Sequence, residues 1–201
     1  MHIYLASKSP RRRELLQQME VPFEVLEVDT PEIVLPNERP AVYSERIVHE
    51  KLQAAWDYII ADNLHPRPVL CADTEVILDG RILGKPQDED DALQMIQSYR
   101  GKTHEVLTSV GLRFGDYQRI TLNKTLVTFG HISDAEIMHY LKSSNYKDKS
   151  GGYGIQSYIG QFILHIEGCF YSVMGLPLHQ VRLLLNEFIH LDRPLRLKTH
   201  E

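Results

Sequence analysis

The sequence predicts one compact α/β unit, with a two-lobed arrangement as an alternative, and three observations lead to this fold class. Short apolar runs typical of buried strands alternate with longer stretches whose apolar residues recur at helical spacing. No internal repeat, low-complexity segment or linker divides the chain. Its 201 residues, 43% hydrophobic and 24% charged, are enough to build a core in one ordinary globular domain or in two small lobes.

The N-terminal segment predicts a strand, a polar loop and a helix. Residues 2–6 (HIYLA) predict a short buried strand. Ser9 suits the N-cap of the helix, with its hydroxyl accepting a free backbone N–H, and Pro10 suits the first helical position. Arg11 to Arg13 then fall in the first turn, where the helix dipole disfavours each exposed cation by about 0.3–1 kcal/mol.

A bound phosphate is one way to offset these charges. Free N–H groups at a helix N-terminus attract anions, and one guanidinium group can donate two parallel hydrogen bonds to the oxygens of a phosphate. The segment SKSPRRR therefore predicts a phosphate site in which Ser7 and Ser9 stand beside Arg11 and Arg12. The alternative is that the arginines are solvated or pair with acids such as Glu14.

A second strand and a long helix follow. The strand is predicted at about residues 22–28, an acidic loop containing Glu32 comes next, and the helix is predicted at about residues 41–62. Lys51 lies at the edge of the buried stripe of this helix. The stripe is marked by apolar residues that step by four, three and four positions: Val48, Leu52, Ala55 and Ile59.

Residues 68–86 predict a β-hairpin. A continuous apolar run ends in Asp-Gly at 79–80, a typical two-residue turn. The register that this turn sets places Thr74 opposite Lys85. Asp73 and Lys85 are therefore expected to be near neighbours, unless a bulge shifts the pairing.

The remaining elements follow from similar signals. The residues after about 190 show no clear pattern and are expected to be peripheral. In chain order, we predict an acid-led helix at 88–100 with Arg100 in its last turn, strands at about 104–114 and 119–129, a helix with a capping box from Ser133 to Glu136 that ends near Leu141, a glycine-rich loop at 147–157, a strand near 162–166, and a final helix with the stripe Val181, Leu184, Leu185 and Phe188.

Composition excludes several function classes. A net charge of −5 argues against broad nucleic-acid binding, so any basic site must be local. Cys71 and Cys169 lie in apolar surroundings without a CxxC spacing, which is typical of buried thiols in a reducing compartment. No signal-peptide pattern occurs, and no apolar run approaches the roughly 18 residues that span a bilayer. We therefore expect a cytoplasmic protein that binds neither nucleic acid nor membranes.

Several polar side chains stand where packing alone gives little reason for them. Asp73 ends an apolar strand, Lys51 and Lys85 add cations, Gln156 follows the glycines of GGYGIQ, and Glu32 is a loop acid able to bind a metal. The ordinary alternatives are a local turn, solvated lysines, a plain glycine turn and a hydrated glutamate. The sequence lacks GxxxxGK[ST], GxGxxG and GxSxG motifs, and its histidines show no metal-binding spacing. A P-loop kinase or serine hydrolase is therefore not expected.

The chain resembles the Maf family of nucleoside triphosphate pyrophosphatases in six motifs that occur in order from residue 3 to about 188: LASKSPRRRELL, HEKLQAA, ADTEVILDGRILGKP, SYRGKTHEVLTSVGL, SGGYGIQS and VMGLPLHQV. This resemblance implies an elongated mixed sheet flanked by helices, related to that of inosine triphosphatases, with two lobes around a cleft. Residues 1–201 would then form one domain. The resemblance also implies cleavage of a nucleoside triphosphate to the monophosphate and pyrophosphate, a divalent cation such as Mg²⁺ or Mn²⁺, and a homodimer.

The resemblance also implies catalytic roles. Asp73 matches the catalytic carboxylate, acting either as general base or as metal ligand. Arg12, Lys51 and Lys85 match cationic clamps on the phosphates, and preorganised cations are well suited to stabilise charge that develops during phosphoryl transfer. Glu32 matches a loop acid that helps to bind the metal.

Substrate choice is implied by three positions. Arg11, Thr74 and Gln156 match the branch that hydrolyses dTTP and UTP, with CTP or modified pyrimidine nucleotides as further candidates. The alternatives are the 7-methyl-GTP branch, which typically carries Trp, Gln and Glu there, and a nucleotide-binding regulator of cell division. Glu75 departs from the pattern because that position is usually apolar, and Arg13, which the motif does not require, is expected to face solvent.

Overall fold

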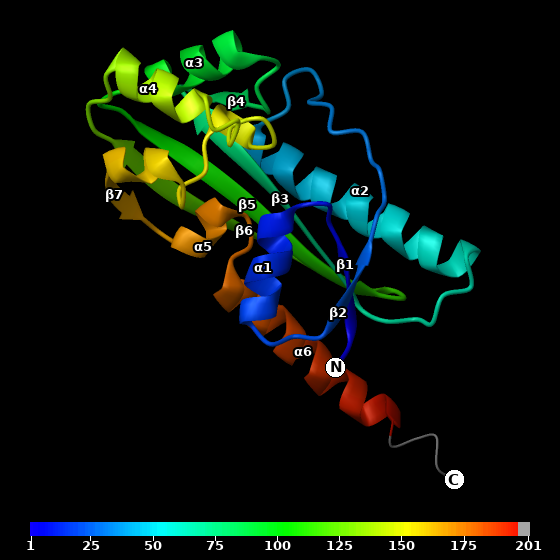
Figure 1. Ribbon diagram of the computed structural model, residues 1–201. Coiled ribbons are helices and arrows are strands. Elements are labelled where there is room, and N and C mark those ends of the chain that lie inside the picture. The colour runs from blue at the N-terminus through cyan, green and yellow to red at the C-terminus, as the bar shows by residue number, and fades with distance from the viewer. Residues whose placement is uncertain (197–201) are drawn as a thin grey trace.

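Seven strands form one mixed sheet, and α3 and α4 gather at one end of the molecule while α6 lies at the other (Figure 1). The structure, a computed structural model, describes the backbone of residues 1–196 and the side chains as far as residue 189. The strands are β1 (Ile3–Ala6), β2 (Phe23–Leu26), β3 (Val69–Leu78), β4 (Arg81–Leu83), β5 (Thr103–Phe114), β6 (Tyr117–Phe129) and β7 (Ile163–Glu167). The helices are α1 (Pro10–Gln18), α2 (Pro40–Ala61), α3 (Glu89–Ser98), α4 (Asp134–Leu141), α5 (Phe170–Met174) and α6 (Leu178–Arg196), with 3₁₀ turns η1 (Ser150–Gly152) and η2 (Tyr158–Phe162).

The strand order leaves one edge of β3 open in its middle. The sheet runs β2-β1-β3-β5-β6-β7, with β1 parallel to β2 and β3 and the later pairs antiparallel. Along one edge, β3 pairs with β1 only at residues 69–70 and with β4 only at residues 76–78. Among the described strands, none pairs with residues 71–75 on this edge. The chain leaving β1 and the turn into β4 therefore frame an opening beside Asp73.

The buried side chains of β1 point to both faces of the sheet, as the two-residue period of a strand requires. Ile3 and Leu5 pack in a cluster with residues of α1 and α6. Tyr4 and Ala6 pack in a second cluster with the buried stripe of α2. A third cluster, which includes Ile96 of α3, fills the other half of the molecule. The cores thus divide between two halves, as expected of two lobes.

Helix α2 packs directly against a glycine of β5. The predicted stripe of α2 is fully buried. A Cβ atom at Gly111 would lie 2.7 Å from Leu52 Cδ1 and 2.9 Å from Val48 Cγ1. The absence of a side chain at Gly111 therefore sets the height of α2 above the sheet, and with it the position of Lys51, the neighbour of Leu52.

Several sequence predictions are confirmed. The hairpin turn at 79–80 sets the predicted register over residues 76–83. Ser133 and Glu136 form the predicted capping box, and all four residues of the predicted α6 stripe are buried. In the described residues no helix is both long and apolar enough to cross a membrane.

Other predictions were wrong in detail. Ser9 occupies the N-cap position of α1, but its side chain makes no capping hydrogen bond; its backbone N–H instead donates to Ser7 Oγ at 3.2 Å. Helix α3 ends at Ser98, so Arg100 lies beyond its last turn and pairs with Asp134. Helix α5 was not predicted. The helix α6 continues past residue 190 to 196, and residues 197–201 lie outside the described part of the chain.

We expect Gly111→Ala to destabilise the protein by about 1–3 kcal/mol, because the added methyl group overpacks the contact between α2 and β5. Urea unfolding measures the change. Gly84→Ala is the matched control, since a Cβ atom there meets nothing within 4 Å and the expected change is below about 1 kcal/mol. Equal stability of the two variants would contradict this account of how α2 is positioned.

Candidate active site

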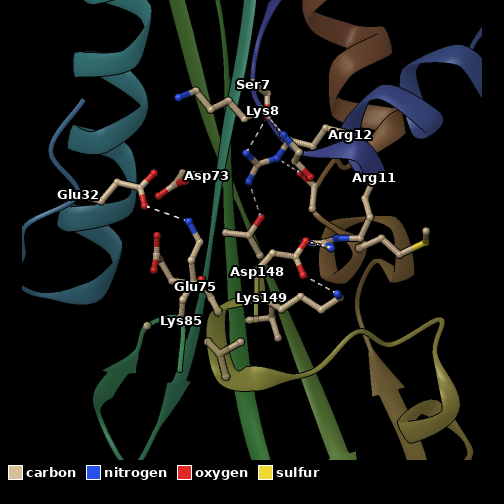
Figure 2. A pocket seen from close by; sticks show the side chains of 18 of the residues that line it. Ser7, Lys8, Arg11, Arg12, Glu32, Asp73, Glu75, Lys85, Asp148 and Lys149 are labelled. Carbon is tan, nitrogen blue, oxygen red and sulfur yellow. Dashed lines mark hydrogen bonds and ion pairs between the residues drawn. The ribbon is translucent and has the colours of Figure 1, made fainter. Parts of the chain in front are cut away.

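All ten residues predicted from the sequence line one cavity of about 730 Å³ at the open edge of β3. They come from the loop between β1 and α1, the first turn of α1, the loop after β2, helix α2, strand β3, the segment after β4 and the glycine loop, which we define as residues 147–157. Figure 2 shows labelled acids and cations of the cavity facing one another across it. The ten are Ser7, Ser9, Arg11, Arg12, Glu32, Lys51, Asp73, Thr74, Lys85 and Gln156.

A buried ion pair forms the centre of the cavity. Lys51 Nζ donates to Asp73 Oδ1 at 2.7 Å and to Glu32 Oε1 at 2.5 Å. The Lys51 and Asp73 side chains are only 13% and 10% exposed. Burial, the largest single influence, would lower the pKa of Lys51, but the charges of Asp73 and Glu32 act together with smaller influences against it and the pKa is raised. Lys51 therefore stays charged at neutral pH.

Asp73 also stays charged. Burial acts to raise the pKa of this carboxyl, but a hydrogen bond with Glu75 and the charges of Lys51 and Arg12 act against it, and the pKa is lowered. An ionised carboxylate held at a fixed place is able to accept a proton or to bind a cation. Both of the roles implied for Asp73 are thus chemically open to it.

Lys85 corrects one prediction. Its ammonium group lies 3.7 Å from Glu32 Oε2, and within the described residues it forms no ion pair with Asp73. The ladder between β3 and β4 stops at Leu83, because the carbonyl of the next residue, Gly84, accepts from the N–H of Gly151 instead. The predicted pairing of Thr74 with Lys85 therefore does not form. Lys85 still lines the cavity, where its ammonium group pairs with Glu32.

The first turn of α1 directs Arg12 into the cavity. Its guanidinium group donates to Gly175 O at 2.9 Å, to Ser7 Oγ at 3.3 Å and to Thr74 Oγ1 at 3.3 Å. Thr74 also accepts from its strand neighbour Thr108 at 3.1 Å. These contacts fix the plane of the guanidinium group before any ligand is present.

The other two arginines of the run find acidic partners. Arg11 Nη1 donates to Asp148 Oδ2 at 2.9 Å and lines the cavity. Arg13 Nη2 lies 3.8 Å from Glu27 Oε1, and its side chain is 37% exposed. The expectation that Arg13 simply faces solvent is therefore wrong in part.

Hydrogen bonds of two tyrosines hold the glycine loop in place. Tyr99 donates its hydroxyl to Gly151 O at 2.8 Å, and the Tyr153 hydroxyl lies 2.7 Å from His104 Nε2. A Cβ atom at Gly151 would lie 2.5 Å from the Tyr99 hydroxyl, and its φ is +72°. Only glycine satisfies both conditions. Gln156 is thereby presented, exposed, on the wall of the cavity.

Comparison with known proteins identifies the family. The profile described as "Maf-like protein" matches residues 2–188. The chain belongs to the Maf family. It is 46% identical over 186 residues to a protein of Chromobacterium violaceum named dTTP/UTP pyrophosphatase, covering 92% of this chain and 94% of that relative.

Further relatives have the same name. The dTTP/UTP pyrophosphatase of Nitrosomonas europaea is 44% identical to this Maf protein over 193 residues, covering 92% of this chain and 93% of the relative. That of Pseudoalteromonas atlantica is 41% identical over 184 residues, covering 92% and 95%. Among solved structures, the Staphylococcus aureus Ham1 protein aligns with a TM-score of 0.41 and 14% identity over 67% of this chain and 73% of that chain.

The acids of the cavity fit a divalent cation shared with substrate. Glu32 and Asp73 offer hard carboxylate oxygens directed at one point, the Lys51 ammonium group. The described residues contain no group of three or more His, Cys, Asp or Glu arranged to hold a metal ion. Mg²⁺ is commonly bound by one or two carboxylates together with substrate phosphates. The donor set therefore fits such a site and not a complete protein cage.

Sequence analysis missed several residues of the cavity in this Maf protein. Asp148, Lys149 and Tyr153 line it, and all three belong to the glycine loop whose last residues had been singled out. The signal was available, because Asp148 and Lys149 directly precede the glycines. Glu75 had been noticed only as a departure from the family pattern. Its spacing of two from Asp73 on one strand places both carboxyl groups on the same face of the sheet.

Glu75 is a buried acid beside the buried ion pair. It is 4% exposed, and its carboxyl group hydrogen-bonds Asp73. Burial, followed by the hydrogen bond and the charge of Asp73, raises the pKa of Glu75 to about 10. At neutral pH Glu75 therefore carries a proton and donates to the ionised Asp73.

We expect Glu75→Gln to stabilise the protein increasingly as pH rises. The pKa of Glu75 is about 10 in the folded chain, compared with 4.5 for an unperturbed glutamate. Above pH 4.5 the unfolded chain therefore loses a proton that the folded chain keeps. The wild type therefore loses stability between about pH 5 and pH 10, whereas glutamine is neutral throughout. Urea unfolding in EDTA should give a gain of about 1–3 kcal/mol at pH 8 and little difference at pH 5.

Glu45→Gln, an exposed change on α2, controls for the loss of one carboxylate from the chain. If Glu75→Gln were less stable than the wild type by the same amount at both pH values, Glu75 would be ionised in the folded protein, contrary to the account above.

Proposed function

We propose that this Maf protein is a nucleoside triphosphate pyrophosphatase that hydrolyses dTTP and UTP to the monophosphate and pyrophosphate. The observation that carries the proposal is the convergence of Arg12, Lys51 and Lys85 around Asp73 in one cavity. The names of the relatives, at 41–46% identity over 92% of the chain, support the same reaction.

The three cations are proposed to bind and orient the triphosphate. Negative charge increases on the phosphoryl oxygens and on the leaving pyrophosphate when the bond between the α- and β-phosphates breaks. Arg12 is held by three acceptors and Lys51 by two carboxylates, so neither must reorganise at the moment of reaction. Lys85, 55% exposed at the rim, is free to move toward the phosphates.

Asp73 is proposed as the essential carboxylate. Its lowered pKa keeps it ionised at neutral pH, and Lys51 fixes one of its oxygens. It would accept a proton from the attacking water or, with Glu32, hold a divalent cation. When bound, such a cation supplies Lewis-acid polarisation of the phosphoryl oxygens.

Base choice is proposed to depend on Arg11, Thr74 and Gln156. The amide of Gln156 is able both to donate and to accept, which suits the edge of a pyrimidine. Thr74 is already engaged by Arg12 and Thr108, so it acts through the placement of Arg12. The relatives reported above all have the dTTP/UTP name, which favours this branch over the 7-methyl-GTP branch.

We also propose that the chain acts as a single catalytic domain in the cytoplasm. The family profile matches residues 2–188, and the two cysteines, Cys71 and Cys169, are free thiols. Homodimer formation stays a prediction.

The substrate assignment predicts the products of one assay. Purified protein with Mg²⁺ or Mn²⁺ should release pyrophosphate and monophosphate from dTTP and UTP, and release them more slowly from 7-methyl-GTP. Product identification by anion-exchange chromatography is the measurement. Release of orthophosphate and a nucleoside diphosphate would contradict the proposed reaction, and faster turnover of 7-methyl-GTP would contradict the proposed branch.

We expect Asp73→Asn to lower kcat for dTTP by about 10²–10⁴-fold, since an amide neither takes up a proton nor binds a cation as a carboxylate does. Nucleotide binding measured by calorimetry should persist, because Arg12 and the other cations are unchanged. Asp57→Asn, the same substitution at an exposed position of α2, is the control. An unimpaired rate in Asp73→Asn would remove Asp73 from the chemical step.

A further inference from the structure

One carboxylate joins two walls of the cavity. Asp148 Oδ2 accepts from Arg11 Nη1 at 2.9 Å, and Asp148 Oδ1 accepts from Lys149 Nζ at 2.7 Å (Figure 2). Arg11 belongs to the first turn of α1, whereas Asp148 and Lys149 belong to the glycine loop. Arg11 and Asp148 are 137 residues apart in the sequence. Each oxygen of Asp148 thus serves a different cation from a different part of the chain.

Lys149 is held beside Gln156. A Cβ atom at Gly154 would lie 2.8 Å from Lys149 Cε and 3.4 Å from Gln156 Oε1. Both side chains therefore border the space that a side chain at Gly154 would fill. Lys149 is only 10% exposed, so this placement is confined by the loop.

The charge of Asp148 holds its two cationic partners, Arg11 and Lys149, close together. Burial alone would raise the pKa of Asp148, but hydrogen bonds from Lys149 and Arg11 outweigh it and the pKa is lowered. The ionised carboxylate neutralises one of its two cationic partners. Without it, Arg11 and Lys149 would repel each other and be drawn toward the nearest anion, which in a loaded site is the triphosphate.

We propose that Asp148 is a positioning residue for base selection, which holds Lys149 beside Gln156, ties Arg11 to the same loop and keeps both cations away from the triphosphate. The proposal rests on the proposed function, because it takes Arg11 and Gln156 as residues that contact the base. Uracil and thymine present a carbonyl acceptor at position 4, where cytosine presents an amino donor, so a cationic donor that faces this position favours uracil and thymine and repels the amino group of cytosine.

Calorimetric binding of the α,β-imido analogues of UTP and CTP tests the proposal, since uracil has a carbonyl group and N3–H where cytosine has an amino group and an unprotonated N3. Wild type is expected to prefer the UTP analogue. Asp148→Asn should reduce that preference about tenfold while binding the CTP analogue at least as tightly as wild type. Asp148→Glu, which keeps both acceptors and the charge, should retain most of the preference.

Asp134→Asn is the matched control. Asp134 likewise accepts from an arginine, Arg100, and from a neighbour, Gln97 Nε2 at 2.9 Å, but it lies outside the cavity lining. Its preference for the UTP analogue should equal that of wild type. Exposed ion pairs contribute little to stability, so both variants are expected to fold, and thermal melting checks this.

Three results would overturn the proposal: no preference in wild type, an unchanged preference in Asp148→Asn, or equal weakening of both analogues in that variant. Because the analogues bind without turnover, none of these results depends on hydrolysis. Failure of wild type to release pyrophosphate from UTP would overturn the proposed function. The binding of the two analogues would still decide whether Asp148 sets the base preference.

Discussion

The ion pair between Lys51 and Asp73 is the interaction on which the site depends. It joins helix α2 to the open stretch of β3, and through Glu32 it adds the loop after β2. A buried charge is tolerated only with a partner, and removal of one partner typically costs about 3–5 kcal/mol. The same contact therefore stabilises the fold across the opening and keeps a cation and a carboxylate charged where a triphosphate would bind. Stability and proposed catalysis are coupled in this one place.

The arginine run shows how a helix tolerates cations at its positive end. In α3 the rule of the helix dipole is obeyed, with Glu89, Asp90 and Asp91 in the first turn. In α1 the first turn has no acid, and the compensation comes from outside the helix. Arg11 and Arg13 pair with acids from other segments, and Arg12 is held by neutral oxygens. Of the three arginines, Arg12 is the one that forms no ion pair within the described residues, so its charge is the most available to an anion in the cavity.

Glu75 adds a polar group to the site without adding a negative charge. A second carboxyl group beside Asp73 would repel it if both were ionised. Burial instead keeps Glu75 protonated, so that it donates a hydrogen bond and adds no charge. The family pattern of an apolar residue is thus replaced by a polar but neutral one. Glu75 therefore adds no third negative charge to those of Asp73 and Glu32, the two carboxylates that Lys51 contacts.

The sequence by itself determined most of the elements, though not α5, together with the turn register of the hairpin and the buried stripes of α2 and α6. These features are local, because strand alternation, helical spacing and an Asp-Gly turn are decided by residues close together in the chain. Only the tertiary structure decided which charges meet. Lys85 pairs with Glu32, a residue of the loop after β2, and Arg11 meets Asp148 across 137 residues. Ion-pair partners depend on where distant segments return in space, which no local pattern specifies.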